Sequence, residues 1–173
     1  MADVTAELGR LARVLSLPDG DFEQSAARVV HEALLCTLHV LVSEGGQCVV
    51  FGVGDGVVSI DGHACILDQG DAPDYPAYAL FPQMAQPRLL VHHLGPFASS
   101  IAICTDGAKE LIARAGELLA DGSALGGLAG FERDDRYTRN KSLAHKRLLS
   151  WCDSSGGPVD DCTIVVVRRT GAP

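Results

Sequence analysis

The sequence lacks the patterns of a zinc site and of a membrane-spanning segment. Its six cysteines form no C-x-x-C pair and show no zinc-like spacing with histidine, so we interpret them as free thiols in a reducing compartment. No stretch approaches the roughly twenty apolar residues of a spanning helix, and no signal peptide is evident at the start. We therefore expect a cytoplasmic protein.

Positive charge is also scarce. The 14 Lys and Arg are outnumbered by 22 Asp and Glu, which leaves a net charge of −8, and the basic residues are scattered apart from the pair at 168–169. We therefore expect no nucleic-acid partner. Because no spanning segment is evident, we also expect no membrane partner. Apolar residues make up 47% of the 173, so we expect one globular domain over 1–173 with a real core.

Two further patterns are missing. No G-x-S-x-G segment is present, so a serine hydrolase triad has no support. The glycines at 52–56 precede a strand rather than a helix, which argues against dinucleotide binding. His92 and His93 are neighbours in a predicted strand, where their side chains point to opposite faces, so we do not expect them to bind one metal.

Apolar periodicity predicts a helical N-terminal part over 1–34 and a β-rich part over 35–168. Four short strands in succession suggest an antiparallel meander, and a proline-rich loop follows over 68–87. Helices are predicted at 3–16, 22–33, 108–120 and within 134–151; strands are predicted at 35–43, 47–53, 57–60, 63–67, 88–94, 99–105 and 162–168. This order indicates an α+β fold.

Two segments place a carboxylate where an apolar strand ends. Asp55 lies between two glycines after the strand 47–53, and Asp106 follows the strand 99–105 directly before a helix. An acidic residue in such a place is usually a turn former. Strand ends are also held rigidly, however, which a site for a hard cation requires.

A third acidic segment precedes the last strand. Asp160 and Asp161 stand directly before the strand 162–168. If that strand runs antiparallel to 99–105, the carboxylates of Asp106 and Asp160 converge, and one cation could then bind both.

The three segments occur in a fixed order: Gly-Asp after a strand, Thr-Asp-Gly with an acid three residues beyond the glycine, and Asp-Asp-x-Thr opening the final strand. In this order and spacing they resemble the later motifs of the PP2C-type metal-dependent protein serine/threonine phosphatases. The resemblance runs from about residue 34 to residue 168. It implies a PP2C-like layered α-β-β-α sandwich of antiparallel sheets, incomplete at the N-terminus.

The resemblance also implies a chemistry. Such phosphatases use two divalent ions, Mn²⁺ or Mg²⁺, to activate a water that attacks the phosphoryl group of a phosphoprotein. By resemblance, Asp106 and Asp160 bind a catalytic metal. Asp55, Asp106 and Glu110 match the ligands of a weaker third metal, and Asp161 matches an orienting residue.

The opening motifs of the family have no match before Leu34. These are a strand with an acidic residue and a phosphate-binding Arg, and an Asp-Gly-x-Gly-Gly segment whose Asp bridges the two metals. Each residue lost from a preorganised site removes transition-state stabilisation. We therefore expect this chain on its own to be a poor enzyme.

Three functions remain open. The first is a PP2C-like phosphatase, the second is a non-catalytic PP2C-like module that binds a partner or a phosphorylated segment, and the third is a structural α+β domain. The missing opening strands would also leave exposed edges, which predicts a homo-oligomer or an aggregation-prone monomer. We expect that contact near the strand Leu35–Ser43 or its neighbours.

Overall fold

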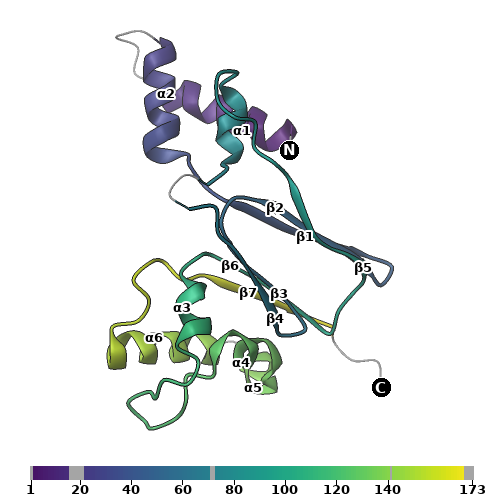
Figure 1. Cartoon of the computed structure of the whole chain (residues 1–173), viewed down its shortest axis with the longest axis vertical. Helices are drawn as coiled ribbons and strands as arrows, with labels where there is room; N and C mark the ends of the chain where they lie inside the picture. The colour runs from purple at the N-terminus through teal and green to yellow at the C-terminus, as the bar shows by residue number, and fades with distance from the viewer. Residues whose placement is uncertain (1, 16–21, 71–72, 141, 170–173) are drawn as a thin grey trace. The chain divides into compact units, whose positions relative to one another are not determined.

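The computed structural model describes residues 2–15, 22–70, 73–140 and 142–169 (Figure 1). Its internal contacts divide the chain into two compact units. Unit 1 comprises Met1–Glu44, Cys48–Gly54 and Asp68–Leu94, and unit 2 comprises Gly45–Gln47, Asp55–Leu67 and Gly95–Pro173. This division does not test the prediction of one domain over 1–173, which stays a prediction.

The helices of unit 1 pack on one another around a small core. Helix α1 (Ala2–Leu15) contacts both α2 (Phe22–Ala33) and the 3₁₀ helix η1 (Pro76–Leu80). Val30 and Ala77 are fully buried at this contact. The two N-terminal helices agree with the apolar periodicity, whereas η1 lies inside the segment predicted to be a loop.

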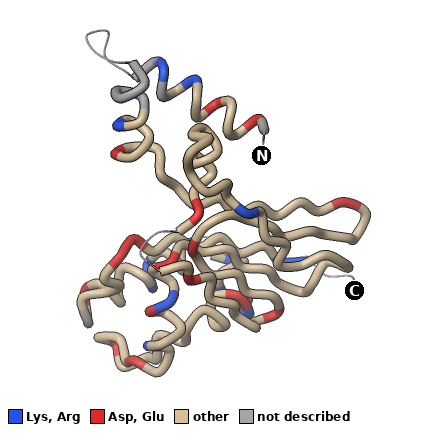
Figure 2. Tube along the Cα trace, turned by 45° about the horizontal axis from the view of Figure 1, so that its top comes forward, with Lys and Arg blue, Asp and Glu red and all other residues tan. Residues whose placement is uncertain are grey.

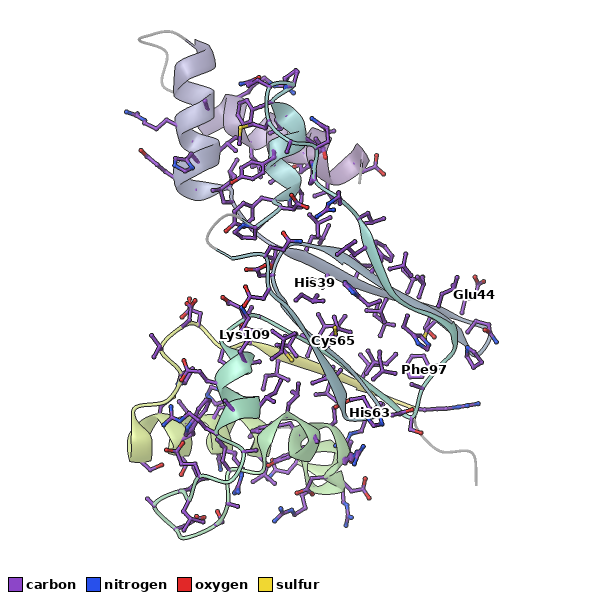
Figure 3. All side chains as sticks on the ribbon, in the orientation of Figure 1. His39, Glu44, His63, Cys65, Phe97 and Lys109 are labelled. Carbon is purple, nitrogen blue, oxygen red and sulfur yellow. The ribbon has the colours of Figure 1, made fainter. Side chains whose placement is uncertain are left out.

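The first sheet has three strands in the order β1-β2-β5. These are β1 (Leu38–Glu44), β2 (Gln47–Val53) and β5 (Leu90–Pro96). The imidazole rings of His39 on β1 and His92 on β5 lie with their centroids 5.8 Å apart. Gly52 of β2 lies against the imidazole ring of His39, which is labelled in Figure 3. A side chain at 52 would collide with that ring, so the glycine makes room for it.

The second sheet has four strands in the order β4-β3-β6-β7, and every neighbouring pair is antiparallel. The strands are β3 (Gly56–Ile60), β4 (His63–Leu67), β6 (Ser100–Cys104) and β7 (Ile164–Arg168). The central strands β3 and β6 are almost entirely buried. Their apolar sequences are typical of strands covered on both faces.

The predicted meander of four successive strands is wrong, because the chain changes sheet after β2. Gly54 takes a left-handed backbone conformation (φ 94°), and a Cβ there would lie 2.9 Å from the carbonyl oxygen of Asp74. The Gly-Asp-Gly segment is thus a crossing point between sheets and not a hairpin turn. Helices together with antiparallel sheet confirm the α+β class, while the layered sandwich stays a prediction.

The described residues of unit 2 form four helices after β6. They are α3 (Ala108–Ala113), α4 (Gly127–Arg133), α5 (Asp135–Arg139) and α6 (Leu143–Ser155). They pack with the sheet around a core that contains Trp151, Leu111 and Phe131. Among the described residues, no helix is long and apolar enough to cross a membrane.

The predicted helix over 108–120 is wrong in its second half. Arg114 leaves helical geometry (φ −105°, ψ 20°), and the chain turns back on itself. The carbonyl oxygens of Ala115 and Glu117 accept hydrogen bonds from the N–H groups of Gly126 and Leu125, at 3.0 and 2.7 Å. Non-local backbone pairing therefore replaces the helical bonds that periodicity predicted over this stretch.

Candidate functional site

Three predicted acidic residues gather at one end of the second sheet, which we call the acid end. Val57 pairs with Cys104, so Asp55 and Asp106 each lie two residues beyond the same pair of the ladder. Cys104 also pairs with Ile164, where β7 begins, and Asp160 lies shortly before that strand. β6 and β7 run antiparallel, as expected, so the exit of β6 and the start of β7 lie at the same end of the sheet, while the convergence of the Asp106 and Asp160 carboxylates stays a prediction.

Two threonines extend the pairing of β6 with β7 toward the acid end. The N–H of Thr105 donates to the carbonyl oxygen of Thr163 at 3.1 Å. The Thr105 hydroxyl donates to the carbonyl oxygen of Asp161 at 2.8 Å and accepts from the N–H of Thr163 at 2.9 Å. These bonds hold the segment that carries the acidic pair beside the exit of β6.

Gly107 allows the closest approach in the acid end. A Cβ at this position would lie 2.6 Å from the carbonyl oxygen of Asp161 and 2.8 Å from that of Asp160. The helix α3 begins directly after it at Ala108, next to Lys109, which is labelled in Figure 3. The glycine after Asp106 is thus needed for packing, since its φ of −53° is accessible to any residue.

Glu110 ties the next segment to α3. Its Oε1 accepts a hydrogen bond from the N–H of Val159 at 2.7 Å, and its Oε2 lies 3.3 Å from the Arg114 guanidinium. Arg114 in turn donates to the carbonyl oxygen of Gly157 at 2.8 Å. Both carboxylate oxygens of Glu110 therefore hold the chain over 157–159, a structural role that sequence reasoning did not foresee.

A buried tryptophan contacts the ion pairs of Arg114. The Arg114 guanidinium lies 5.2 Å from the centre of the Trp151 ring, a cation–π arrangement. Glu117 bridges the two, because it pairs with Arg114 at 2.9 Å and accepts the indole N–H of Trp151 at 3.1 Å. The Trp151 side chain is fully buried, so its one donor is satisfied where water cannot reach it.

The carboxylates of Asp106 and Asp160 each accept a hydrogen bond from the backbone N–H of the next residue. The N–H of Gly107 donates to Oδ1 of Asp106 at 3.1 Å, and the N–H of Asp161 donates to Oδ1 of Asp160 at 2.7 Å. Asp55 and Asp106 are half-buried, while Asp160 and Asp161 are exposed. Such local bonds are typical of turn carboxylates, and they also orient each group.

The donor set can be tested against the metals that the resemblance implies. Carboxylates suit hard cations such as Mn²⁺ and Mg²⁺. Burial raises the pKa of Cys104 to about 12 and also raises the pKa of Cys162, so both nearby thiols are neutral in the metal-free protein. In the described part of the chain, no group of three or more His, Cys, Asp or Glu is placed to hold a metal ion.

The described residues therefore do not fit a complete two-metal centre, and we derive no catalytic step through one. The roles expected for Asp55, Asp106, Glu110 and Asp160 stay predictions. A cavity of about 470 Å³ opens beside Asp160 and is lined by α6. Its lining includes His145, Trp151 and Cys152.

Sequence reasoning also missed a buried carboxylate at the other end of β6. Glu132 of α4 is fully buried and accepts the hydroxyl hydrogens of Ser59 at 2.5 Å and Ser100 at 3.1 Å. Nothing in the local sequence Gly-Phe-Glu-Arg marks this glutamate as buried. Because Ser100 begins β6 and Cys104 ends it, Glu132 belongs to the scaffold and not to the acid end.

Comparisons with known proteins give weak likenesses. No protein-family model matches the chain, and no curated protein matches its sequence. One is a solved structure of the phosphatase domain of the cell fate determinant SpoIIE from Bacillus subtilis, presoaked in Mn. The match covers 98% of this chain and 75% of the SpoIIE chain, with 12% sequence identity and a TM-score of 0.39. Another is the catalytic domain of the serine threonine protein phosphatase PstP, in complex with 2 manganese ions. That match covers 95% of this chain and 80% of the PstP chain, with 17% sequence identity and a TM-score of 0.36.

Proposed function

We propose that this chain is a PP2C-like serine/threonine phosphoprotein phosphatase module that depends on Mn²⁺ or Mg²⁺. The observation that carries the proposal is the acid end. Asp55 and Asp106 lie beyond one pair of the β3–β6 ladder, and Gly107 packs on the backbone of Asp160 and Asp161. That the three acidic segments lie at the same end of the second sheet supports the proposal.

Activity of this chain alone is expected to be low. The acid end offers fewer ligands than two metals need, and Glu110 is engaged by Val159 and Arg114. We propose that Asp106 and Asp160 supply the protein ligands to one cation, with water completing its coordination. Efficient hydrolysis then requires ligands from outside the described residues.

Hydrolysis of p-nitrophenyl phosphate and of a phosphothreonine peptide in Mn²⁺, compared with EDTA, tests this function. We expect slow, Mn²⁺-dependent release of phosphate, which Asp106→Asn and Asp160→Asn each abolish. The variant Asp153→Asn, an exposed residue of α6, is the matched control and should retain the rate. Equal rates in parent and Asp106→Asn would contradict the proposal.

The second candidate is a non-catalytic module of the same fold that binds a partner or a phosphorylated segment. It is favoured by the engagement of both Glu110 oxygens in holding the chain over 157–159. A cation that binds only the folded state raises the melting temperature. Stabilisation by Mn²⁺ without phosphate release would support this candidate, whereas neither effect would indicate a structural domain.

A further inference from the structure

The edge strand β7 combines an unpaired backbone with opposite charges at its two ends. In the described part of the chain, β7 has one sheet neighbour, β6, so its other side is a sheet edge. Asp160 and Asp161 precede the strand and Arg169 follows it, and all three are exposed. Between them lies an apolar, β-branched sequence, Ile-Val-Val-Val, of the kind that readily pairs with another strand.

We propose that two copies of this chain associate through antiparallel pairing of their β7 strands. An antiparallel arrangement brings the acidic start of each strand opposite the basic end of the other. The two four-stranded sheets would then continue into one sheet across a two-fold axis. This proposal is independent of the proposed phosphatase activity.

The alternation of hydrogen-bond directions along β7 leaves backbone N–H and C=O groups free to pair with a second copy. The carbonyl oxygen of Thr163 accepts from Thr105, and the N–H of Arg169 donates to Ser99, so both residues bond toward β6. Backbone groups alternate in direction along an antiparallel strand. The N–H and C=O groups of Ile164 and Val166 therefore point to the open edge.

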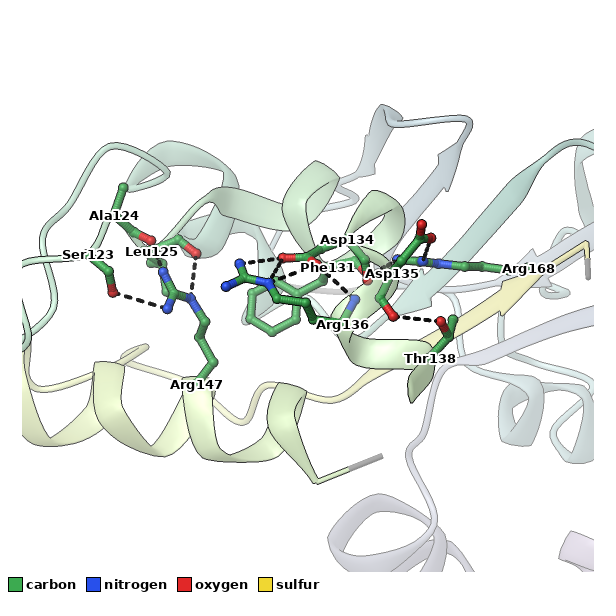
Figure 4. A network of polar contacts seen from close by, with 10 residues as sticks. All are labelled: Ser123, Ala124, Leu125, Phe131, Asp134, Asp135, Arg136, Thr138, Arg147 and Arg168. Atoms are coloured by element: carbon green, nitrogen blue, oxygen red, sulfur yellow. Dashed lines mark hydrogen bonds and ion pairs between the residues drawn. The ribbon is translucent and has the colours of Figure 1, made fainter. Parts of the chain in front are cut away.

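The charges select one register. A two-fold axis between identical antiparallel strands passes through a residue that faces its own copy. With Val165 at the axis, Asp161 of one copy faces Arg169 of the other, and this pair forms twice. Shifting the axis to Ile164 would instead place Asp160 opposite Arg168. That guanidinium already donates to the carbonyl oxygens of Phe131 and Asp134, at 2.9 and 3.1 Å (Figure 4).

The remaining described edges fit self-pairing less well. β4 is flanked by Asp61 and Asp68, so antiparallel copies would bring like charges together. β5 contains Pro96 and therefore lacks one N–H. β1, which lies near the contact expected from the sequence, carries Glu44 at one end and no Lys or Arg.

The exposure of two valines of β7 supports the same surface. The side chain of Val165 is 54% exposed and that of Val167 is 36% exposed, and both are apolar. Pairing would set Val165 beside its own copy and Val167 beside Thr163 of that copy. The copies would thereby remove β-branched side chains from water in addition to closing the backbone edge.

Sedimentation velocity from 1 to about 100 μM protein tests the charge pairing through three variants. We expect Arg169→Glu to raise the dimer Kd about tenfold or more, because attraction becomes repulsion at two symmetric places. The double variant Asp161→Lys/Arg169→Glu should restore dimerisation. Lys146→Glu, at an exposed residue of α6, makes the same charge change away from β7 and should leave the Kd unaltered.

Cysteine cross-linking tests the register. Residues facing each other in a non-hydrogen-bonded pair have Cα atoms about 4.5 Å apart, within disulfide reach. Val165→Cys should therefore form a disulfide-linked dimer on mild oxidation, above the background of the parent and its exposed Cys36, Cys65 and Cys152. Val167→Cys is the matched control, because two copies of residue 167 would lie more than about 10 Å apart.

Three outcomes would overturn the proposal. The first is a monomer throughout this concentration range. The second is a dimer whose Kd does not respond to Arg169→Glu. The third is a dimer in which Val165→Cys and Val167→Cys cross-link equally, which would place the contact elsewhere. Cooperative thermal unfolding of each variant establishes that it is folded before its association is compared.

Discussion

Gly107 lies so close to Asp161 that a Cβ at position 107 would be 2.6 Å from the Asp161 carbonyl oxygen. This contact joins the exit of β6 to the segment before β7. The atom that a Cβ would meet is a backbone oxygen, which cannot move aside as the end of a flexible side chain could.

Gly107→Ala should therefore destabilise the protein. The added methyl group must displace the backbone of Asp160 and Asp161, and overpacking of this kind costs about 1–3 kcal/mol. The free energy of unfolding in urea measures the loss. Gly116→Ala is the control, because a Cβ at that position has nothing within 4 Å and the substitution should be neutral or slightly stabilising. Equal stability of the two variants would contradict the packing role of Gly107.

Removing the buried carboxylate of α4 should also cost stability. Glu132→Ala leaves the hydroxyl groups of Ser59 and Ser100 without their acceptor in a buried place, which we expect to lower the free energy of unfolding by about 3 kcal/mol. Glu132→Gln keeps an acceptor oxygen and should lose less. Asp153→Ala, at an exposed position, should change stability by about 0.5 kcal/mol or less.

Arg114→Met should release the chain over 157–159 from α3. The variant loses the bond to the carbonyl oxygen of Gly157 and the ion pairs with Glu110 and Glu117. Because these bonds join α3 to the segment over 157–159, the free energy of unfolding should fall in Arg114→Met. Faster hydrogen exchange of the Val159 amide distinguishes local release from general loosening. Arg139→Met, at an exposed residue of α5, should leave that exchange rate unchanged.

His92 of the first sheet should make the free energy of unfolding fall in mild acid. Burial, followed by the proximity of His39, lowers the pKa of His92 below its usual 6.5. A lowered folded-state pKa means that the folded protein disfavours the charged imidazole. The associated stability is complete above pH 6.5 and declines as the pH falls from there through the folded-state pKa.

Melting temperatures of the parent and of His92→Gln between pH 7.5 and 5 check this. The parent should lose more stability than the variant below pH 6.5, since glutamine does not titrate there. Parallel curves for the two proteins would show that His92 carries no such linkage. His145→Gln, at an exposed position of α6, serves as the matched control.

Local patterns were sufficient for most elements of the fold. Helical periodicity located α1 and α2, and runs of apolar residues between turn residues located every strand to within a few residues. The carboxylates after β6 and before β7 were also visible, because the residues that flank a strand are set by its position in the sequence. These features depend on neighbours along the chain, which periodicity and turn chemistry describe.

Local patterns could not predict which residues distant in sequence contact one another in the fold. The sequence determined by itself where β2 and β3 lie, but tertiary structure decided that they join different sheets, because strand pairing depends on contacts distant in sequence. It likewise decided that Glu110 holds Val159 and that Glu132 lies buried beneath two serines. A carboxylate has the same local signature whether it caps a turn, binds a cation or accepts buried hydroxyl groups, and the atoms that surround it in the fold make the difference.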